Sequence, residues 1–364
     1  MTSDQRAAKP ELEPPCPICV APGARMIAVA HDRLFGIAFG NFHLYRCRSC
    51  GCVFQHPLPD SATLASFYPR QYWWSESRQS RFSSVLSRME RAYREFVALD
   101  HVRFLERCAA GAGSGRSLLD IGCGSGTFLH LARRRGFLPH GMDVSARAVA
   151  AAREQYGLAV RQGEIGSDVW KGRDFDLVTM FHVLEHLPDP RRAITYAGGL
   201  LKPGGRLILQ VPNVASLQAR IFGARWYGLD VPRHLINFTP QALRLLLGQA
   251  GFSCKLVPRF SLRDNPASLA SSLAIGLDPI GRRGREKRSN AIMEGALEIC
   301  YFGLVLLALL PALIESLCGR GGTLWAEARR KIGDSRFEIR DSRFENFESR
   351  ISNRQFLRVL GSWR

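Results

Sequence analysis

Negative charge is scarce in this chain, whose 364 residues include 32 Asp and Glu against 50 Lys and Arg, a formal net charge of +18. The basic excess permits attraction to nucleic acid, anionic lipid or an acidic glycan, but arginine-rich composition alone also produces it, so it selects no partner. The stretch 1–15 lacks an apolar core, so we expect no signal peptide. With 46% hydrophobic and 23% charged residues, the composition is that of a folded soluble protein with one large or two smaller domains.

The ten cysteines form no disulfide framework, which is typical of a protein of the reducing cytoplasm. Four of them make two Cys-x-x-Cys pairs, Cys16 with Cys19 and Cys47 with Cys50. Two such pairs on tight turns present four thiolates to one tetrahedral Zn²⁺, with strands expected at 26–30 and 42–46. The gap between the pairs is longer than is usual for a zinc ribbon, and coincidental pairing is the alternative. Cys52 is another possible ligand, but Gly51 suits a turn at Cys50. Four cysteine ligands leave no open position, so the predicted zinc is structural.

A glycine-rich loop follows a short apolar strand in the segment 118–128, Leu-Leu-Asp-Ile-Gly-Cys-Gly-Ser-Gly-Thr-Phe. Gly122, Gly124 and Gly126 permit a tight turn and the close approach of a ligand at the start of a helix. Asp120 at the strand end would repel a pyrophosphate but suits a ligand with an ammonium group. Asp143 follows at the distance where the next strand delivers a carboxylate to ribose hydroxyls.

This pattern resembles the class I S-adenosylmethionine-dependent methyltransferases. The segments 175–190, 201–213 and 321–329 are similar to their fourth strand with its loop, the turn into their fifth strand, and their last strand. The resemblance extends over roughly residues 90 to 330 and implies an α/β fold with a doubly wound, mostly parallel seven-stranded sheet. Strands and helices do alternate along this region, with strands expected at 117–121, 138–143, 159–162, 175–181, 205–211 and 253–260.

The resemblance also assigns residues to the methyl donor, S-adenosylmethionine. Asp120 and the three glycines would hold its methionine moiety, Asp143 its ribose and Glu164 its adenine, with Phe181 beside the cofactor at the end of the fourth strand. Each acid could instead be an ordinary turn or helix-cap residue.

Three histidines are candidates for a general base. His182 and His186 flank Glu185 in the loop after the fourth strand, where they could accept a proton or only shape the site. His234 is the better candidate, because it lies in the insertion after the fifth strand, which we expect to cover the acceptor. In deoxysugar C-methyltransferases a Glu-His pair precedes a similar segment and its histidine is the base, whereas here Arg233 replaces the glutamate. His234 remains available as a base for O-methylation.

We expect four parts in the chain: a zinc-ribbon-like segment at 1–66, an aromatic segment and amphipathic helix at 67–116, the methyltransferase domain at 117–330, and a low-complexity, disordered tail at 331–364. The aromatic cluster at 67–74 packs the small segment onto the domain or, through Tyr68 and Tyr72, contacts substrate. A zinc ribbon followed by a Tyr-rich segment and this fold resembles bacterial small-molecule methyltransferases, including the deoxysugar enzymes.

An apolar run at 299–314, within a helical insertion near 292–318, follows a basic run at 282–288. The run is shorter than the roughly 20 residues that span a bilayer, and Pro311 interrupts it. If 323–329 is the last strand, the chain must return to the sheet. We therefore expect a buried helix, or peripheral contact with the membrane through 282–317. The expected location is the cytoplasm, in the second case at the inner face of the membrane.

Three functions remain open. A small-molecule acceptor, such as a sugar, a glycan or a lipid-linked intermediate, is favoured. An RNA methyltransferase would use the basic charge and the zinc segment, but the loop after the fourth strand lacks both the Asn/Asp-Pro-Pro-aromatic motif for exocyclic amines and a Pro-Cys nucleophile. A non-catalytic binding module is disfavoured by the intact glycine loop and ribose acid.

Overall fold

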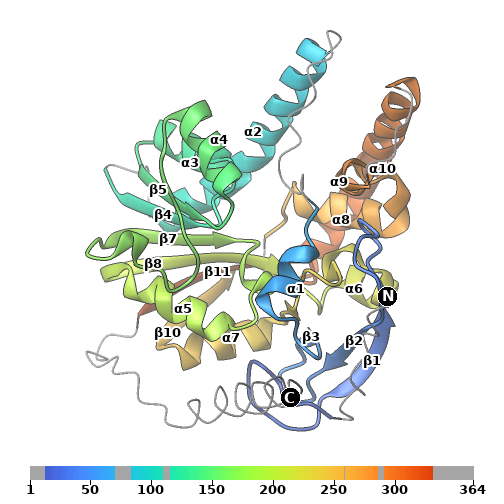
Figure 1. Ribbon diagram of the computed structural model, residues 1–364, viewed down its shortest axis with the longest axis horizontal. Helices are drawn as coiled ribbons and strands as arrows, with labels where there is room; N and C mark the ends of the chain where they lie inside the picture. The colour runs from blue at the N-terminus through green and yellow to red at the C-terminus, as the bar shows by residue number, and fades with distance from the viewer. Residues whose placement is uncertain (1–12, 70–82, 110–114, 258, 286–290, 331–364) are drawn as a thin grey trace, which may run out of the picture. The chain divides into compact units, whose positions relative to one another are not determined.

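A seven-stranded sheet lies at the centre of the structure, a computed structural model that describes residues 13–69, 83–109, 115–257, 259–285 and 291–330 (Figure 1). The strand order is β10-β11-β8-β7-β4-β5-β6. The strands are β4 (Ser117–Ile121), β5 (Leu138–Asp143), β6 (Ala159–Gln162), β7 (Phe175–Phe181), β8 (Leu201–Pro212), β10 (Phe252–Val257) and β11 (Thr323–Arg330). Strands β4 to β8 pair in parallel, and β11 is antiparallel to both β8 and β10. The predicted doubly wound, mostly parallel sheet is confirmed.

The strands β4, β5, β6 and β7 have the bounds that the sequence predicts. Apolar runs mark β4 and β7, and the alternation with helices marks β5 and β6. Strand β8 differs, since it begins at Leu201 and not at Gly205. Leu201 pairs with Phe175, and the register then shifts before Leu177 pairs with Arg206. The expected glycine turn is therefore part of an irregular start of the strand.

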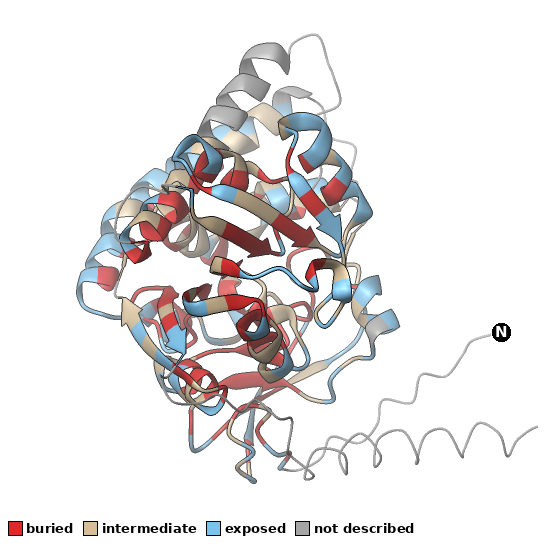
Figure 2. Ribbon diagram, turned by 90° about the vertical axis from the view of Figure 1, so that its left-hand side faces the viewer, coloured by how far each residue is buried: buried red, intermediate tan, exposed pale blue. Residues whose placement is uncertain are grey.

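Helices cover both faces of the sheet. They are α2 (Ser83–Cys108), α3 (Thr127–Arg134) and α4 (Ala146–Tyr156) on one face, and α5 (Pro190–Gly199) and α7 (Pro240–Gln249) on the other. Side-chain caps fix three of the helix starts: Ser145 accepts from Ala148 N, and Asp189 and Thr239 cap helices whose first residue is proline. Figure 2 shows the buried residues concentrated in the strands between the helices.

A second, four-stranded sheet carries the N-terminal cysteines. Its order is β1-β2-β3-β9, with β1 (Arg25–Ala30), β2 (Phe42–Arg46), β3 (Val53–Gln55) and β9 (Ile236–Asn237). The two expected strands are β1 and β2. The fourth strand comes from the insertion after β8, so the predicted segment 1–66 shares its sheet with that insertion. Residues 331–364 and Tyr72 lie outside the described residues.

The remaining elements are short. They are α1 (Ser61–Ser66), α6 (Leu217–Phe222), α8 (Asp264–Leu273), α9 (Pro279–Gly284), and the 3-10 turns η1 (Asp168–Trp170), η2 (Leu184–His186), η3 (Gly223–Arg225), η4 (Tyr227–Leu229) and η5 (Ile275–Leu277).

Helix α10 (Ala291–Leu317) fills the predicted insertion and differs from expectation in two ways. It is longer than the apolar run and continues through Pro311. Its segment Met293–Leu317 is long and apolar enough to cross a membrane by length and composition, with mean hydropathy 2.3. Only 17% of an apolar 18-residue stretch within this segment is buried, so the alternative of a buried helix is wrong. The chain then returns to the large sheet as β11, as the sequence predicts.

Candidate active site

The glycine loop joins β4 to α3 at the carboxyl edge of the parallel strands. Gly122, Gly124 and Gly126 all have positive φ, of 78°, 52° and 77°. A Cβ on Gly122 would lie 2.5 Å from Val183 Cγ2, and one on Gly126 would lie 2.5 Å from Leu158 Cδ1. A Cβ on Gly124 would meet nothing within 4 Å. Two of the glycines thus allow close packing, and the middle one leaves backbone open to a ligand.

The two predicted acids lie beside this loop. Asp143, at the end of β5, accepts hydrogen bonds from the backbone N–H of Gly124 (2.9 Å) and of Ser145 (2.8 Å). Asp120 is buried and accepts from the Thr179 hydroxyl at 2.6 Å. Burial raises the pKa of Asp120 to about 7; the Thr179 hydrogen bond opposes this rise and the charge of Asp143 adds to it. Burial also raises the pKa of Asp143. A cationic ligand here would relieve the cost of two desolvated carboxylates.

The two other residues assigned to the donor have different surroundings. Glu164 is exposed, directly after β6, and the neighbouring Gly163 N–H donates to the Asp143 carbonyl oxygen at 3.0 Å. Phe181 is half-buried at the end of β7, with its ring centroid 4.5 Å from that of His101 and 5.1 Å from that of Phe128. Phe181 ends the strand β7 beside β4, and Glu164 follows β6, the strand beside β5. The contact of both residues with the donor stays a prediction.

His182 lies between two carboxylates. Its Nδ1 is 3.1 Å from Glu185 Oε1, and its Nε2 is 3.3 Å from Asp264 Oδ2. Burial alone would lower the pKa of this imidazole, but the two carboxylates outweigh burial and raise it to about 9. His182 has φ of 56°, a left-handed conformation that is rare for a residue with a side chain. The two carboxylates stabilise the protonated ring, which favours a positioning role for His182, and its role as a base stays a prediction.

Asp264 belongs to a buried polar network that the sequence did not reveal. Its Oδ2, besides its ion-pair contact with His182, accepts hydrogen bonds from Gln210 Nε2 (2.8 Å) and the Ser261 hydroxyl (2.7 Å). Gln210 Oε1 in turn lies 2.6 Å from Nε2 of His101, on helix α2. Burial lowers the pKa of His101 to about 3, so this ring is neutral and donates to Gln210. The network links β8, α2 and α8 to His182, and no local motif marks it.

His186 and His234 have neighbouring imidazoles, with ring centroids 4.6 Å apart. Nδ1 of His234 lies 2.8 Å from the carbonyl oxygen of Gly228, and Nδ1 of His186 lies 3.1 Å from that of Arg233. A carbonyl only accepts, so the Nδ1 of each ring donates, and Nε2 is the ring nitrogen left to act as an acceptor or a ligand. Burial lowers the pKa of His186 to about 4. The hydroxyl of Tyr68 lies 3.0 Å from Nδ1 of His186, which brings the aromatic segment to the site as one alternative predicted.

The pair of histidines lies close to an unsatisfied carboxylate oxygen. Glu185, His186 and His234 each offer a ligand atom within 4.8 Å of the others. Oε2 of Glu185 is buried and has no hydrogen-bond partner among the residues that the structure describes. One carboxylate and two imidazoles are a donor set that can bind a divalent cation, or can accept a proton from a substrate.

Arg233 holds the covering segment in place. Its Nη2 lies 2.7 Å from Asp230 Oδ1 and 2.8 Å from Asp32 Oδ1, and its Nη1 donates to the Phe67 carbonyl at 3.2 Å. The guanidinium is completely buried, and the two carboxylates raise its pKa despite that burial. Arg233 therefore fastens the N-terminal segment to the insertion that carries His234, and it is not a base.

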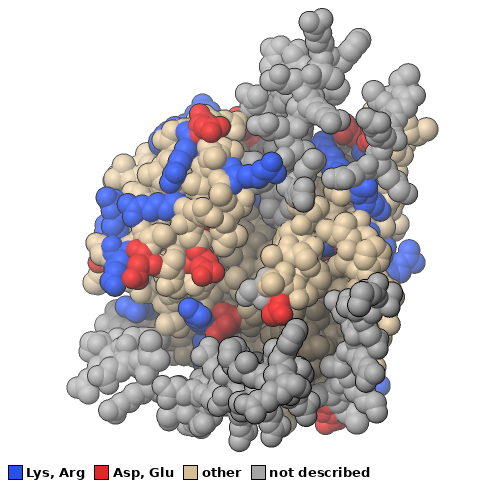
Figure 3. Space-filling view, in the orientation of Figure 1, with Lys and Arg blue, Asp and Glu red and all other residues tan. Residues whose placement is uncertain are grey.

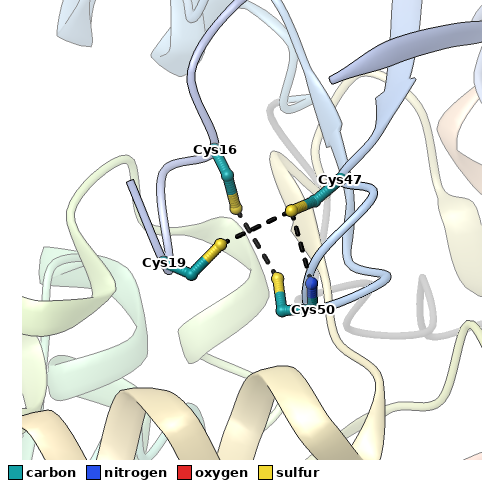
Figure 4. Close-up of side chains that lie close together, drawn as sticks. All are labelled: Cys16, Cys19, Cys47 and Cys50. Atoms are coloured by element: carbon teal, nitrogen blue, oxygen red, sulfur yellow. Dashed lines mark hydrogen bonds between the residues drawn. The ribbon is translucent and has the colours of Figure 1, made fainter. Parts of the chain in front are cut away.

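The four predicted metal ligands converge at the edge of the small sheet. Cys16, Cys19, Cys47 and Cys50 point toward one centre (Figure 4), and their Sγ atoms all lie within 4.8 Å of one another. Backbone N–H groups also point at the sulfurs: Ile18 N is 3.4 Å from Cys16 Sγ, and Ser49 N is 3.3 Å from Cys47 Sγ.

The alternative ligand, Cys52, is adjacent to the cluster, since its Sγ lies 3.4 Å from the Sγ atoms of Cys16 and Cys50. Gly51, with φ of 74°, forms the expected turn.

Comparison with known proteins finds similarity over the same region. Residues 88–256 match the family described as a methyltransferase domain. The ubiquinone biosynthesis O-methyltransferase of Cereibacter sphaeroides is 33% identical over 171 residues, which are 44% of this chain and 68% of that protein. The protein of the same name from Cupriavidus pinatubonensis is 28% identical over 177 residues, 45% of this chain and 70% of that protein. A solved SAM-dependent methyltransferase from Thermotoga maritima, described as a possible histamine N-methyltransferase, is 18% identical with a TM-score of 0.41, and the match covers 69% of this chain and 97% of that one.

Proposed function

The chain belongs to the S-adenosylmethionine-dependent methyltransferases, and from this premise we propose that it methylates a small molecule: a sugar, a glycan or a lipid-linked intermediate. The donor supplies an electrophilic methyl group that a nucleophile displaces in line. The protein has to align the two reactants and exclude water. The names of the curated relatives support O-methylation, although C-methylation uses the same kind of base.

In this proposal the donor lies on the glycine loop. The open backbone of Gly124 and the carboxylates of Asp120 and Asp143 support that position. The loop after β7 packs directly on the glycine loop, because Val183 occupies the space that a Cβ of Gly122 would need. His182 and its carboxylate partners would fix the conformation of that loop.

His234 is our candidate for the general base. The observation that carries this assignment is the hydrogen bond from its Nδ1–H to the Gly228 carbonyl, which leaves the lone pair on Nε2 beside His186. Arg233, buried between two carboxylates, would keep this segment closed over the acceptor.

The base assignment is tested with His234→Gln and, as a matched control, His31→Gln on an exposed ring. Transfer from labelled donor is measured against nucleotide sugars, isoprenoid-linked sugars and RNA. We expect His234→Gln to lower kcat by about 100-fold or more and to leave the affinity for S-adenosylhomocysteine within about twofold. Unchanged kcat would refute the assignment, and transfer to RNA alone would refute the small-molecule acceptor. Activity that is lost on chelation and restored by a divalent cation would make Glu185, His186 and His234 metal ligands.

We also propose that the four-cysteine cluster binds a structural Zn²⁺. The donor set and the N–H groups directed at the sulfurs fit a closed tetrahedral site. Elemental analysis of the purified protein should give one zinc per chain. Cys47→Ser should lose the metal and lower the melting temperature, whereas Cys254→Ser, outside the cluster, should do neither. A metal-free wild-type protein that is fully folded would exclude the site.

A further inference from the structure

The large apolar side chains of helix α10 face away from the domain, which is the opposite of a helix in a water-soluble domain. Its inward side carries small and polar residues, among them Ala308, Ala312 and Ser316, which are nearly completely buried. Its outward side carries large aliphatic residues. Leu307 is 76% exposed and Leu317 is 78% exposed. A soluble helix places its leucines against the core, so this arrangement indicates an apolar environment outside the protein.

The polar groups of the inward side are all engaged with the domain. The hydroxyl of Tyr301 lies 3.1 Å from that of Ser271 on α8. Glu315 accepts from the backbone N–H of Gln218 at 2.8 Å and from its Nε2 at 2.7 Å. Further along the same side, the Ser316 hydroxyl accepts from Asn265 Nδ2 at 2.8 Å. These contacts hold both halves of α10 against the same domain, beside α8 and α9 (Figure 1), so the orientation of the outward side is fixed.

The outward side forms one continuous stripe, which we call the leucine face. It consists of Ile299, Leu306, Leu307, Leu310, Ile314 and Leu317, each more than half exposed. These positions recur at helical spacing, and no charged residue occurs between Ile299 and Ile314. The stripe is about 27 Å long at 1.5 Å per residue.

Cationic side chains lie at both ends of the leucine face. On α9, Arg282 is paired with Glu294, and Arg283 lies 3.4 Å from Glu298. Near the other end, exposed Arg320 follows α10, and its carbonyl accepts from the N–H of Leu217, the first residue of α6. Basic side chains are also spread over the face of the molecule seen in Figure 3. The net charge of +18 gives the same sign to the protein as a whole.

We propose that the leucine face docks the protein on an anionic lipid bilayer, with α10 lying in the plane of the interface. The helix cannot cross the bilayer, because contacts in both of its halves bind it to one domain that also contains β11. A lipid surface fits better than a partner protein, since protein interfaces carry about one hydrogen bond per 100–200 Å² and this stripe offers only hydrocarbon. An apolar stripe with flanking cations is the pattern of an interfacial helix. This inference does not depend on the identity of the methyl acceptor.

Flotation of the full-length protein with vesicles tests the proposal. One set of vesicles contains phosphatidylcholine alone, and the other contains phosphatidylcholine mixed with phosphatidylglycerol. We expect binding to both, stronger for the anionic vesicles at low ionic strength, with the difference largely removed at about 1 M salt. The double variant Leu306→Glu/Leu310→Glu should lower the partition coefficient by about 100-fold, roughly tenfold for each buried leucine lost. The matched control Leu138→Glu changes a leucine that is 54% exposed on β5 and should bind as the wild type does.

A second measurement keeps the proposal testable if the double variant is poorly folded. An environment-sensitive fluorophore on the exposed thiol of Cys300, in a Cys318→Ser background, should shift to the blue when anionic vesicles are added. Wild-type protein that stays with the soluble fraction at low salt and shows no shift would overturn the proposal. A dimer in solution that the double variant dissociates, without vesicle binding, would identify a second copy of the chain as the occupant of the leucine face.

Discussion

Replacing Asp120 by Asn is expected to stabilise the folded protein and at the same time weaken donor binding. The carboxyl group is buried, and its pKa is raised to about 7. An exposed aspartate has a pKa near 4, and each pKa unit corresponds to about 1.4 kcal/mol. The ionised side chain therefore costs the folded protein up to about 4 kcal/mol at about pH 8. Asn removes this cost and still offers an acceptor to the Thr179 hydroxyl.

The sign of the pH dependence follows from the same values. The folded protein binds the proton of Asp120 more tightly than the unfolded chain does, so the carboxyl causes no loss of stability below about pH 4. The loss develops between about pH 4 and pH 7, and it is complete above the folded-state pKa of about 7. The gain from Asp120→Asn should accordingly be large at about pH 8 and small at about pH 4.

The affinity for the donor should change with pH in the opposite direction to the stability. In our proposal the ammonium group of the donor lies near Asp120 and favours the ionised carboxylate. Removing one charge-assisted hydrogen bond lowers the binding free energy by about 1.5–3 kcal/mol. The affinity of wild-type protein for S-adenosylhomocysteine should rise with pH up to about 7, with release of a proton. In Asp120→Asn it should be about 10-fold to 100-fold lower and show a weaker pH dependence.

Denaturant unfolding and calorimetric titration at several pH values check both effects. Asp176→Asn is the matched control on β7. Although burial raises the pKa of Asp176, its contacts with Lys202 and Ser117 lower it overall, so this variant should lose stability and keep donor affinity. An Asp120→Asn protein that is less stable than wild type at about pH 8, or that binds the donor equally well, would refute the reasoning.

Two further predictions concern the same site. Asp143→Ala should weaken the binding of S-adenosylhomocysteine by at least about tenfold in calorimetry, because the loss of a charged acceptor costs about 1.5–3 kcal/mol; unchanged affinity would contradict a ribose contact. Asp264→Asn should bring the pKa of His182 down from about 9, because the carboxylate that contributes most to holding it up is gone. Titration of the histidine ring resonances by NMR measures this change, and an unaltered titration curve would show that Glu185 alone keeps the ring charged.

The features that could be predicted from the sequence are local ones. The glycine loop, both acids and the two Cys-x-x-Cys pairs each depend on residues within a few positions of one another, where backbone geometry fixes the outcome. The bounds of the central strands β4 and β7 were equally accessible, since each is a short apolar run. Asp120, Asp143 and Cys47 therefore lie where their spacing predicts.

The polar network around His182 could not be predicted in this way. Asp264 begins a helix in a segment without a motif, and Gln210 looks like an ordinary residue of a buried strand. Their partnership joins positions 54 residues apart. The consequence for chemistry is large, because the two carboxylates raise the pKa of His182 and favour its protonated form over the free base. The same reasoning applies to Arg233, whose partner Asp32 is 201 residues away.

Helix α10 illustrates how packing, and not composition, decides which side of a helix faces inward. Its sequence offers leucines on one side and Tyr301, Glu315 and Ser316 on the other. Turning the leucines inward would place Glu315 and Ser316 away from Gln218 and Asn265, whose buried polar groups would then lose their partners. Each such loss costs about 1–3 kcal/mol, comparable to the gain from burying a leucine. The domain surface that receives α10 is polar, so it selects the polar side, and the leucine face is left for a surface outside the chain.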